Sequence, residues 1–238
     1  MSEAPIQILL DRTDQLRARL IRIILVVILV AVVAYVFRGR VMDFLRRPLS
    51  TDSLIFIHPT EAFFTYIKIS LFVGVLVSAP YILYQILKMT APMFEGKGKL
   101  GNKYMLSTFL FGTVFFYLGA SFAILAVLPF AMQFLKGISG EHLEAVFTVG
   151  NYASFVMAFT LIFGFVFELP VISFTLSRMG LITKDTLIKR WRVAIAVAAV
   201  VAAVLTPPDP ITQMFLWGPL LVLYGLSILL AAIAERRQ

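Results

Sequence analysis

Long uninterrupted runs of apolar residues restrict the fold of this chain of 238 residues more than any other feature. A helix that crosses a bilayer needs about 20 predominantly apolar residues. Hydrophobic residues make up 60% of the chain and charged residues 14%, whereas soluble domains are about half apolar and a quarter charged. Six runs approach the required length, near residues 21–37, 62–87, 104–129, 151–177, 192–205 and 211–234. The sequence therefore predicts an all-α integral membrane protein with six transmembrane helices.

We expect a single membrane domain over residues 1–238, because no internal repeat, low-complexity tract or soluble segment separates the runs. The first run lacks a small-residue cleavage site, which argues against a removed signal peptide. The fifth and sixth spans are predicted to be short, and a short span thins the bilayer or packs against its neighbours. Prolines in or next to the spans predict kinked helices and a concave bundle. They are Pro80, Pro129, Pro170 and Pro219.

The distribution of basic residues predicts the orientation of the chain. Fifteen Lys and Arg residues lie in the two terminal tails and in the two loops predicted on the same side, and five lie in the opposite loops. Basic residues favour the cytoplasmic side, so both termini are expected in the cytoplasm. The net charge of +8 then reflects topology and lipid contact. Its dispersion over several loops is unlike a nucleic-acid-binding face.

The motifs of several enzyme classes are absent from the sequence. It contains no P-loop, no HExxH pair and no GxSxG elbow. His58 and His142 are isolated in predicted loops and there is no cysteine, so neither a zinc site nor a disulfide is expected. The sequence predicts a protein that is not an enzyme and that has no metal and no cofactor.

One carboxylate, Glu168, lies deep inside the fourth apolar run, two residues before Pro170. An ionisable group at the bilayer centre costs roughly 2.5–3.5 kcal/mol on insertion scales and is a functional candidate. Pro170 cannot donate to the carbonyl of Val166, so the helix should break beside the acid. Two interpretations remain open. Glu168 either locks helix packing as a protonated or hydrogen-bonded acid, or it lines a polar concavity that contacts a partner.

Several strings of this chain, taken in order, resemble the TatC family of twin-arginine protein translocase subunits. They are residues 78–85 (SAPYILYQ), 116–119 (FYLG), 128–131 (LPFA), 154–158 (SFVMA), 167–170 (FELP), 179–183 (MGLIT) and 205–209 (LTPPD). The resemblance implies a receptor in a bacterial or archaeal cytoplasmic membrane that recognises twin-arginine signal peptides of folded cargo. It also implies assembly with TatA/TatB-type single-span partners, homo-oligomers within a larger complex, and export driven by the proton-motive force.

The resemblance also implies three groups of site residues besides the intramembrane pair Glu168 and Pro170. The group for the signal peptide comprises Asp14, Gln15, Leu16, Arg17, Arg19, Tyr84, Gln85, Pro92, Glu95, Gly98 and Lys99. A partner helix would dock at Thr206, Asp209 and Gln213, and Pro48 and Pro80 would be structural.

Two positions depart from the family pattern. Gln15 and Gly98 stand where the family has the acids that hold the signal's arginine pair. Guanidinium binds carboxylate through charge-assisted, bidentate hydrogen bonds that glutamine and glycine cannot supply. A TatC-fold scaffold with weakened twin-arginine recognition is therefore an alternative function. A secondary transporter is a further alternative, although the sequence lacks the inverted repeats typical of that class.

Other roles also remain open for several of these residues. Tyr84 can be an interfacial anchor. Lys99 and its basic neighbours can contact lipid. Thr206 and Asp209 can simply form a turn.

Overall fold

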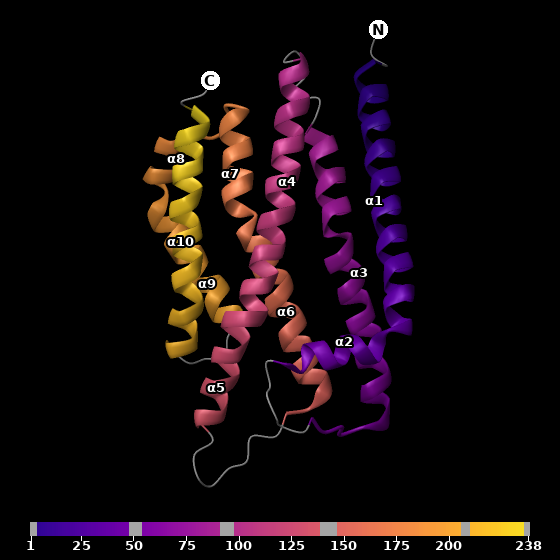
Figure 1. Cartoon of the computed structure of the whole chain (residues 1–238). Coiled ribbons are helices and arrows are strands. Elements are labelled where there is room, and N and C mark those ends of the chain that lie inside the picture. The colour runs from indigo at the N-terminus through magenta and orange to yellow at the C-terminus, as the bar shows by residue number, and fades with distance from the viewer. Residues whose placement is uncertain (1–3, 48–53, 91–97, 139–146, 206–209, 236–238) are drawn as a thin grey trace.

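The described part of the chain folds into a bundle of helices in this computed structural model (Figure 1). It covers residues 4–47, 54–90, 98–138, 147–205 and 210–235, so Pro48, Pro92, Glu95, Thr206 and Asp209 lie outside it. The α-helices of the described residues are α1 (Ala4–Val36), α2 (Arg38–Leu45), α3 (Pro59–Thr90), α4 (Gly98–Phe122), α5 (Leu128–Ile138), α6 (Val149–Phe167), α7 (Leu169–Arg178), α8 (Lys184–Lys189), α9 (Trp191–Leu205) and α10 (Pro210–Glu235).

The long helices run along one axis, and both termini lie at one end of the bundle, here named the termini end (Figure 1). The six predicted spans, an even number, would also place both termini on one side. The predicted all-α membrane architecture is confirmed. In the part of the chain that the structure describes, five helical segments are long and apolar enough to cross a bilayer, namely Leu16–Val36, Thr60–Met89, Met105–Phe134, Val149–Arg178 and Leu216–Glu235. The apolar stretch of α9, Trp191–Ala203, which corresponds to the predicted fifth span, is shorter, so the total of six crossings stays a prediction. The predicted sixth span is not short, because α10 has 26 residues.

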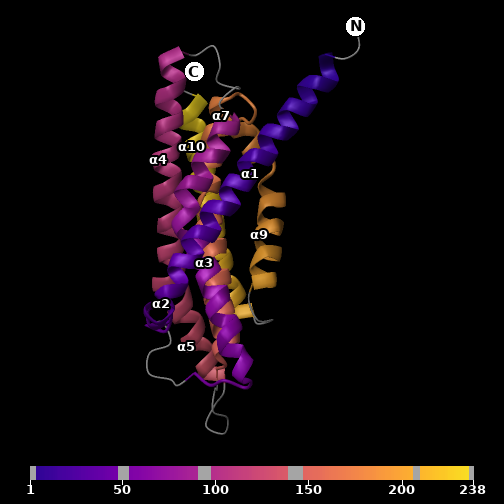
Figure 2. The same cartoon turned by 90° about the vertical axis from the view of Figure 1, so that its right-hand side faces the viewer.

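The surface of α1 is that of a lipid-facing helix. Leu20, Leu25 and Leu29 are 59%, 59% and 66% exposed. Contiguous exposed apolar surface of this kind marks contact with a membrane or a partner. The N-terminal half of α1 diverges from α3 and α4 (Figure 2). The beginning of the first span is therefore accessible from several sides at the termini end.

The third span does not end at Pro129, where the sequence analysis placed its end. A π-helical turn, Ala123–Val127, joins α4 to α5, and the amide of Leu128 donates to the carbonyl of Ala123, five residues back. This wider turn changes the hydrogen-bond spacing immediately before proline, which itself lacks a donor. Pro129 is the second residue of α5, and the helix continues to Ile138.

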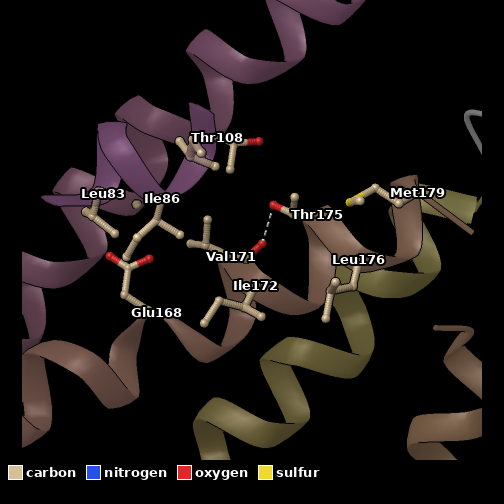
Figure 3. Close-up of a pocket in the computed structure, with 11 residues that line it drawn as sticks. Leu83, Ile86, Thr108, Glu168, Val171, Ile172, Thr175, Leu176 and Met179 are labelled. Carbon is tan, nitrogen blue, oxygen red and sulfur yellow. Dashed lines mark hydrogen bonds between the residues drawn. The ribbon is translucent and has the colours of Figure 1, made fainter. Parts of the chain in front are cut away.

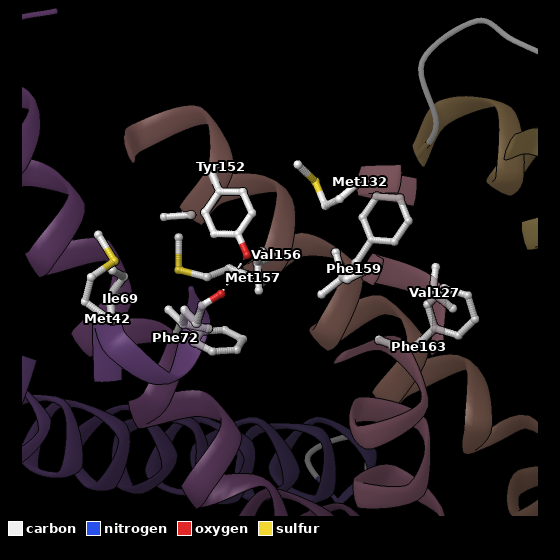
Figure 4. Close-up of a cluster of buried hydrophobic side chains, with 14 of the residues drawn as sticks. Met42, Ile69, Phe72, Val127, Met132, Tyr152, Val156, Met157, Phe159 and Phe163 are labelled. Carbon is white, nitrogen blue, oxygen red and sulfur yellow. Dashed lines mark hydrogen bonds between the residues drawn. The ribbon is translucent and has the colours of Figure 1, made fainter. Parts of the chain in front are cut away.

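The core of the bundle surrounds α6. Its buried residues include Tyr152, Val156, Phe159 and Phe163, which face α2, α3 and the π-helical turn (Figure 4). The hydroxyl of Tyr152 donates to the carbonyl of Leu45 at 2.7 Å. This bond holds the end of the crosswise helix α2 against α6.

At the end opposite the termini, Glu61 in the first turn of α3 joins the loop before α3 to the start of α6. Its carboxylate accepts the amides of Ile57 (3.0 Å) and Gly150 (2.9 Å). Next to it, a short parallel bridge pairs Ile55 with Thr148. Backbone amides at a helix start otherwise lack partners, so the carboxylate satisfies one at the start of α6.

Gly119 allows α4 and α6 to approach closely. A Cβ at this position would overlap the carbonyl oxygen of Phe163 and lie 2.8 Å from the Cβ of Phe167. Small residues at such crossings are typical of membrane helix pairs. Gly225 on α10, in contrast, has no heavy atom within 4 Å of the same constructed position.

We predict that Gly119→Ala lowers the stability of the protein by about 1–3 kcal/mol, because the backbone carbonyl of α6 cannot yield as a side chain can. For a chain of this size the unfolding midpoint should fall by roughly 2–4 °C per kcal/mol. The fluorescence of Trp191 and Trp217 during heating in detergent reports that midpoint. The matched variant Gly225→Ala should leave it unchanged or raise it, since alanine favours helices. Equal midpoints for the two variants would contradict close packing at Gly119.

Candidate functional site

Glu168 occupies the junction between α6 and α7, where the fourth span breaks. Its amide donates to the carbonyl of Phe165 at 3.1 Å, and its own carbonyl accepts the amide of Ile172 at 2.8 Å. Pro170 follows in the first turn of α7, where a missing amide donor is tolerated. The predicted acid beside a helix break is thus confirmed. The junction turns the side chain inward, and Glu168 is 5% exposed.

A cavity of about 150 Å³ adjoins the Glu168 carboxyl group, between α3, α4 and α7 (Figure 3). Its walls are mostly aliphatic, with Leu83, Ile86 and Ile172 among them, and its other polar side chains are Thr108 and Thr175. Within the described residues, the buried Oε1 of Glu168 has no hydrogen-bond partner. The hydroxyl of Thr175 already donates to the carbonyl of Val171 at 2.8 Å. The cavity therefore presents an acceptor to any donor that enters it.

Gly112 on α4 makes room for this carboxyl group. A Cβ at position 112 would lie 3.1 Å from the Oε2 of Glu168. Sequence analysis did not single out Gly112, Thr108 or Thr175. Their spacing in the sequence could have pointed to them. Thr108 and Gly112 are four residues apart and so share one helix face, and Thr175 follows Glu168 by seven residues.

The N-terminal signal-peptide candidates belong to α1. Asp14 and Gln15 lie within this helix. Leu16 and Arg17 are exposed, and Arg19 is half-buried. Gly98 and Lys99 are the first residues of α4, so both ends of the predicted signal site lie at the termini end of the bundle (Figure 1).

Tyr84 and Gln85 point in different directions near the end of α3. Tyr84 is partly exposed; the Lys88 ammonium lies 4.6 Å from its ring centroid, and the Phe109 ring packs edge-on against it. Gln85 is 5% exposed and donates to the hydroxyl of Tyr81 at 2.7 Å. Tyr84 is therefore available to a ligand at the surface, whereas the Gln85 amide is occupied inside the bundle.

At the opposite end of the bundle, Gln213 and Trp217 of α10 form side-chain hydrogen bonds to the backbone of α9. The amide of Gln213 donates to the carbonyl of Ala199 at 3.4 Å, a long contact, and the indole of Trp217 donates to that of Ile195 at 3.2 Å. Pro80 lies inside α3. The structure thus places the signal candidates, Glu168 and Gln213 at three separate levels of the bundle rather than in one site.

Comparison with known proteins places the chain among protein translocase subunits. The family model described as "Sec-independent protein translocase protein (TatC)" matches residues 11–219. A TatC protein from Desulforapulum autotrophicum is 35% identical and the match covers 96% of this chain and 85% of the relative; one from Aquifex aeolicus is 34% identical, with 97% of each covered.

Comparison with solved structures points to the same family as these relatives. A crystal structure of the twin-arginine translocase receptor TatC superimposes with a TM-score of 0.83 at 34% identity, covering 94% of this chain and 99% of that one. A second crystal structure of the receptor, in the detergent DDM, gives the same TM-score and identity. The chain therefore belongs to the TatC family of Sec-independent protein translocase proteins.

Proposed function

We propose that this protein is the receptor subunit of a twin-arginine translocase, which recognises signal peptides on folded cargo and assembles with TatA/TatB-type single-span proteins. The observation that carries the proposal is the buried Glu168 beside a cavity at a helix break, in a bundle of the TatC family. A span maintained only for packing has no need of an ionisable group at this depth, since such a group costs several kcal/mol.

The signal peptide is proposed to bind at the termini end, between the N-terminal part of α1 and the start of α4. The exposed Leu16 and the divergence of α1 from α4 give a peptide access there (Figure 2). Gln15 and Gly98 supply no carboxylate, so the arginine pair would depend on the remaining acids Asp11, Asp14 and Glu95. This weaker charge complement favours, as a second candidate function, a TatC-fold scaffold with reduced twin-arginine recognition.

The termini end is proposed to face the cytoplasm of a bacterial or archaeal cell, as the excess of basic residues favours. Transport would draw on the proton-motive force, with the protein acting as a homo-oligomer inside a larger translocase complex. Glu168 would accept a hydrogen bond from a polar side chain of a signal peptide or partner helix. Because hydrogen bonds between membrane helices average under about 1 kcal/mol, such a contact selects partners rather than holding them tightly.

A complementation experiment separates the receptor from the scaffold. In a cell that lacks its own TatC but contains the partner subunits, this protein should export a folded fluorescent reporter with a twin-arginine signal and not a twin-lysine control. The double variant Gln15→Glu, Gly98→Glu should raise export about tenfold, because two carboxylates can bind guanidinium bidentately.

The matched control Gly39→Glu places an acid at the opposite end of the bundle, where a side chain has open space. It should leave export unchanged. If neither the original chain nor the double variant exports the twin-arginine reporter better than the twin-lysine control, the receptor function is rejected and the scaffold function remains.

Replacing Glu168 distinguishes transport from packing. Glu168→Gln keeps the size of the side chain, so the unfolding midpoint should change little while export falls at least tenfold. Gly112→Val should lower export similarly, because its side chain would collide with the carboxyl group. Reporter export and detergent midpoints are measured on the same preparations. Full export by a stably inserted Glu168→Ala variant would remove Glu168 from the mechanism.

Partner docking near Gln213 is testable by cross-linking, because the chain has no cysteine of its own. A cysteine at the exposed Met214 should form a disulfide with a cysteine in a TatA/TatB-type helix. Adding Thr206→Leu and Gln213→Leu should reduce the yield about fivefold, the effect of losing roughly 1 kcal/mol of hydrogen bonding. Ser121→Leu, an exposed polar-to-apolar change on α4, is the control. Undiminished cross-linking in the double variant would count against docking here.

A further inference from the structure

A second cavity lies on the other side of the broken fourth span, beneath α9. Its volume is about 340 Å³, and its walls come from the α6–α7 junction, α9 and α10. Val166 and Leu169 form one wall and Leu220 another. Among the described residues that line it, Arg190 at the junction of α8 and α9 is the charged one. The hydroxyl of Tyr224, the other polar group in the walls, is occupied by the carbonyl of Leu187 at 2.6 Å.

One face of α9 lines the whole length of this cavity. The contributing residues recur at helical spacing, and they are Val193, Ala194, Val197, Ala198 and Val201. α9 stands to one side of the bundle, apart from α3 and α4 (Figure 2), and packs mainly on α10. It leaves a lengthwise groove against the α6–α7 junction.

The groove has the depth of one lipid leaflet. From Arg190 to Val201 is eleven residues, about 16 Å at 1.5 Å per residue. Half of a hydrocarbon core of about 30 Å is nearly the same length. The exposed Trp191 stands at the start of α9, and tryptophan is enriched at the level of the lipid head groups. Arg190 therefore lies at head-group depth, with the aliphatic walls below it.

The width of the groove decides between a lipid chain and a protein helix. A volume of about 340 Å³ spread over about 16 Å is much less than a helix of that length occupies, because a helix with its side chains is about 10–12 Å across. A single hydrocarbon chain fits this space and a transmembrane helix does not.

The charge around the mouth of the groove selects an anionic head group. Lys184, Lys189 and Arg190 lie within seven residues, and the acids described nearby are Asp185 and Glu235. The carboxylate of Glu235 accepts the amide of Lys184 and is thereby engaged away from Arg190. Basic pockets between membrane helices bind phospholipid head groups in this way. We propose that this groove binds one anionic phospholipid from the leaflet on the α8 side, with an acyl chain under α9 and its phosphate on Arg190.

The two tryptophans of the chain, Trp191 and Trp217, lie on α9 and α10, the helices that bound the groove. The full-length protein is reconstituted in phosphatidylcholine vesicles that contain a small fraction of phosphatidylglycerol or phosphatidylcholine with brominated acyl chains. Quenching, normalised to each variant in unbrominated lipid, gives the preference for the anionic lipid. We expect a preference of about fivefold, the effect of one basic residue at an anionic surface, and its loss in Arg190→Gln.

Two matched controls make the test specific. Arg192→Gln removes the same charge two residues further along, about 200° around the helix, and should keep the preference. Ala194→Phe fills the groove and should reduce quenching by both brominated lipids, whereas Ala196→Phe on the exposed face of α9 should not. Equal losses in Arg190→Gln and Arg192→Gln, equal quenching in the two phenylalanine variants, or no anionic preference in the original chain would each overturn the proposal.

Discussion

The need to satisfy backbone amides and carbonyls without water governs this structure. In hydrocarbon each unpaired group costs several kcal/mol, so a chain crosses as helices and can break only where other groups compensate. Within the described residues, the regular α-helical hydrogen bonding of the spans is interrupted in two such places. At Ala123–Val127 the hydrogen bonds shift to a five-residue spacing. Around Glu168 the bonds to Phe165 and from Ile172 bracket the position where Pro170 offers no donor.

Close helix contact depends on residues without side chains. A Cβ at Gly164 would lie 2.8 Å from the Phe116 ring, and one at Gly74 would lie 2.7 Å from the Val27 carbonyl oxygen. Lipid is as apolar as leucine, so shape rather than hydrophobicity holds such pairs together. Gly112 differs from these glycines because the space it leaves is filled by the carboxyl group of Glu168. The same small residue that elsewhere joins two backbones here admits an ionisable group.

The sequence predicted what depends on composition and on single residues. Long apolar runs predicted the transmembrane helices. Glu168 and Pro170 predicted the break in the fourth span, because the cost of burying an acid and the missing amide of proline are local effects. It did not predict that the helix continues past Pro129, since the compensating π-helical turn precedes the proline. Contacts between distant segments were also missed. Glu61 receives the amide of Gly150, 89 residues away, and no local pattern announces such a pair.

The broken fourth span separates two cavities of opposite character. Glu168 and Val171 face the cavity toward α3 and α4, whereas Val166 and Leu169 face the groove under α9. In a straight helix, the residue spacing alone would fix the angle between these two faces. Here the turn at Glu168 also determines that angle. The first cavity contains a carboxyl group and the second ends at a guanidinium, so the two cavities suit ligands of different chemistry. Because residues of this junction line both cavities, a change in the bend would alter both walls at once.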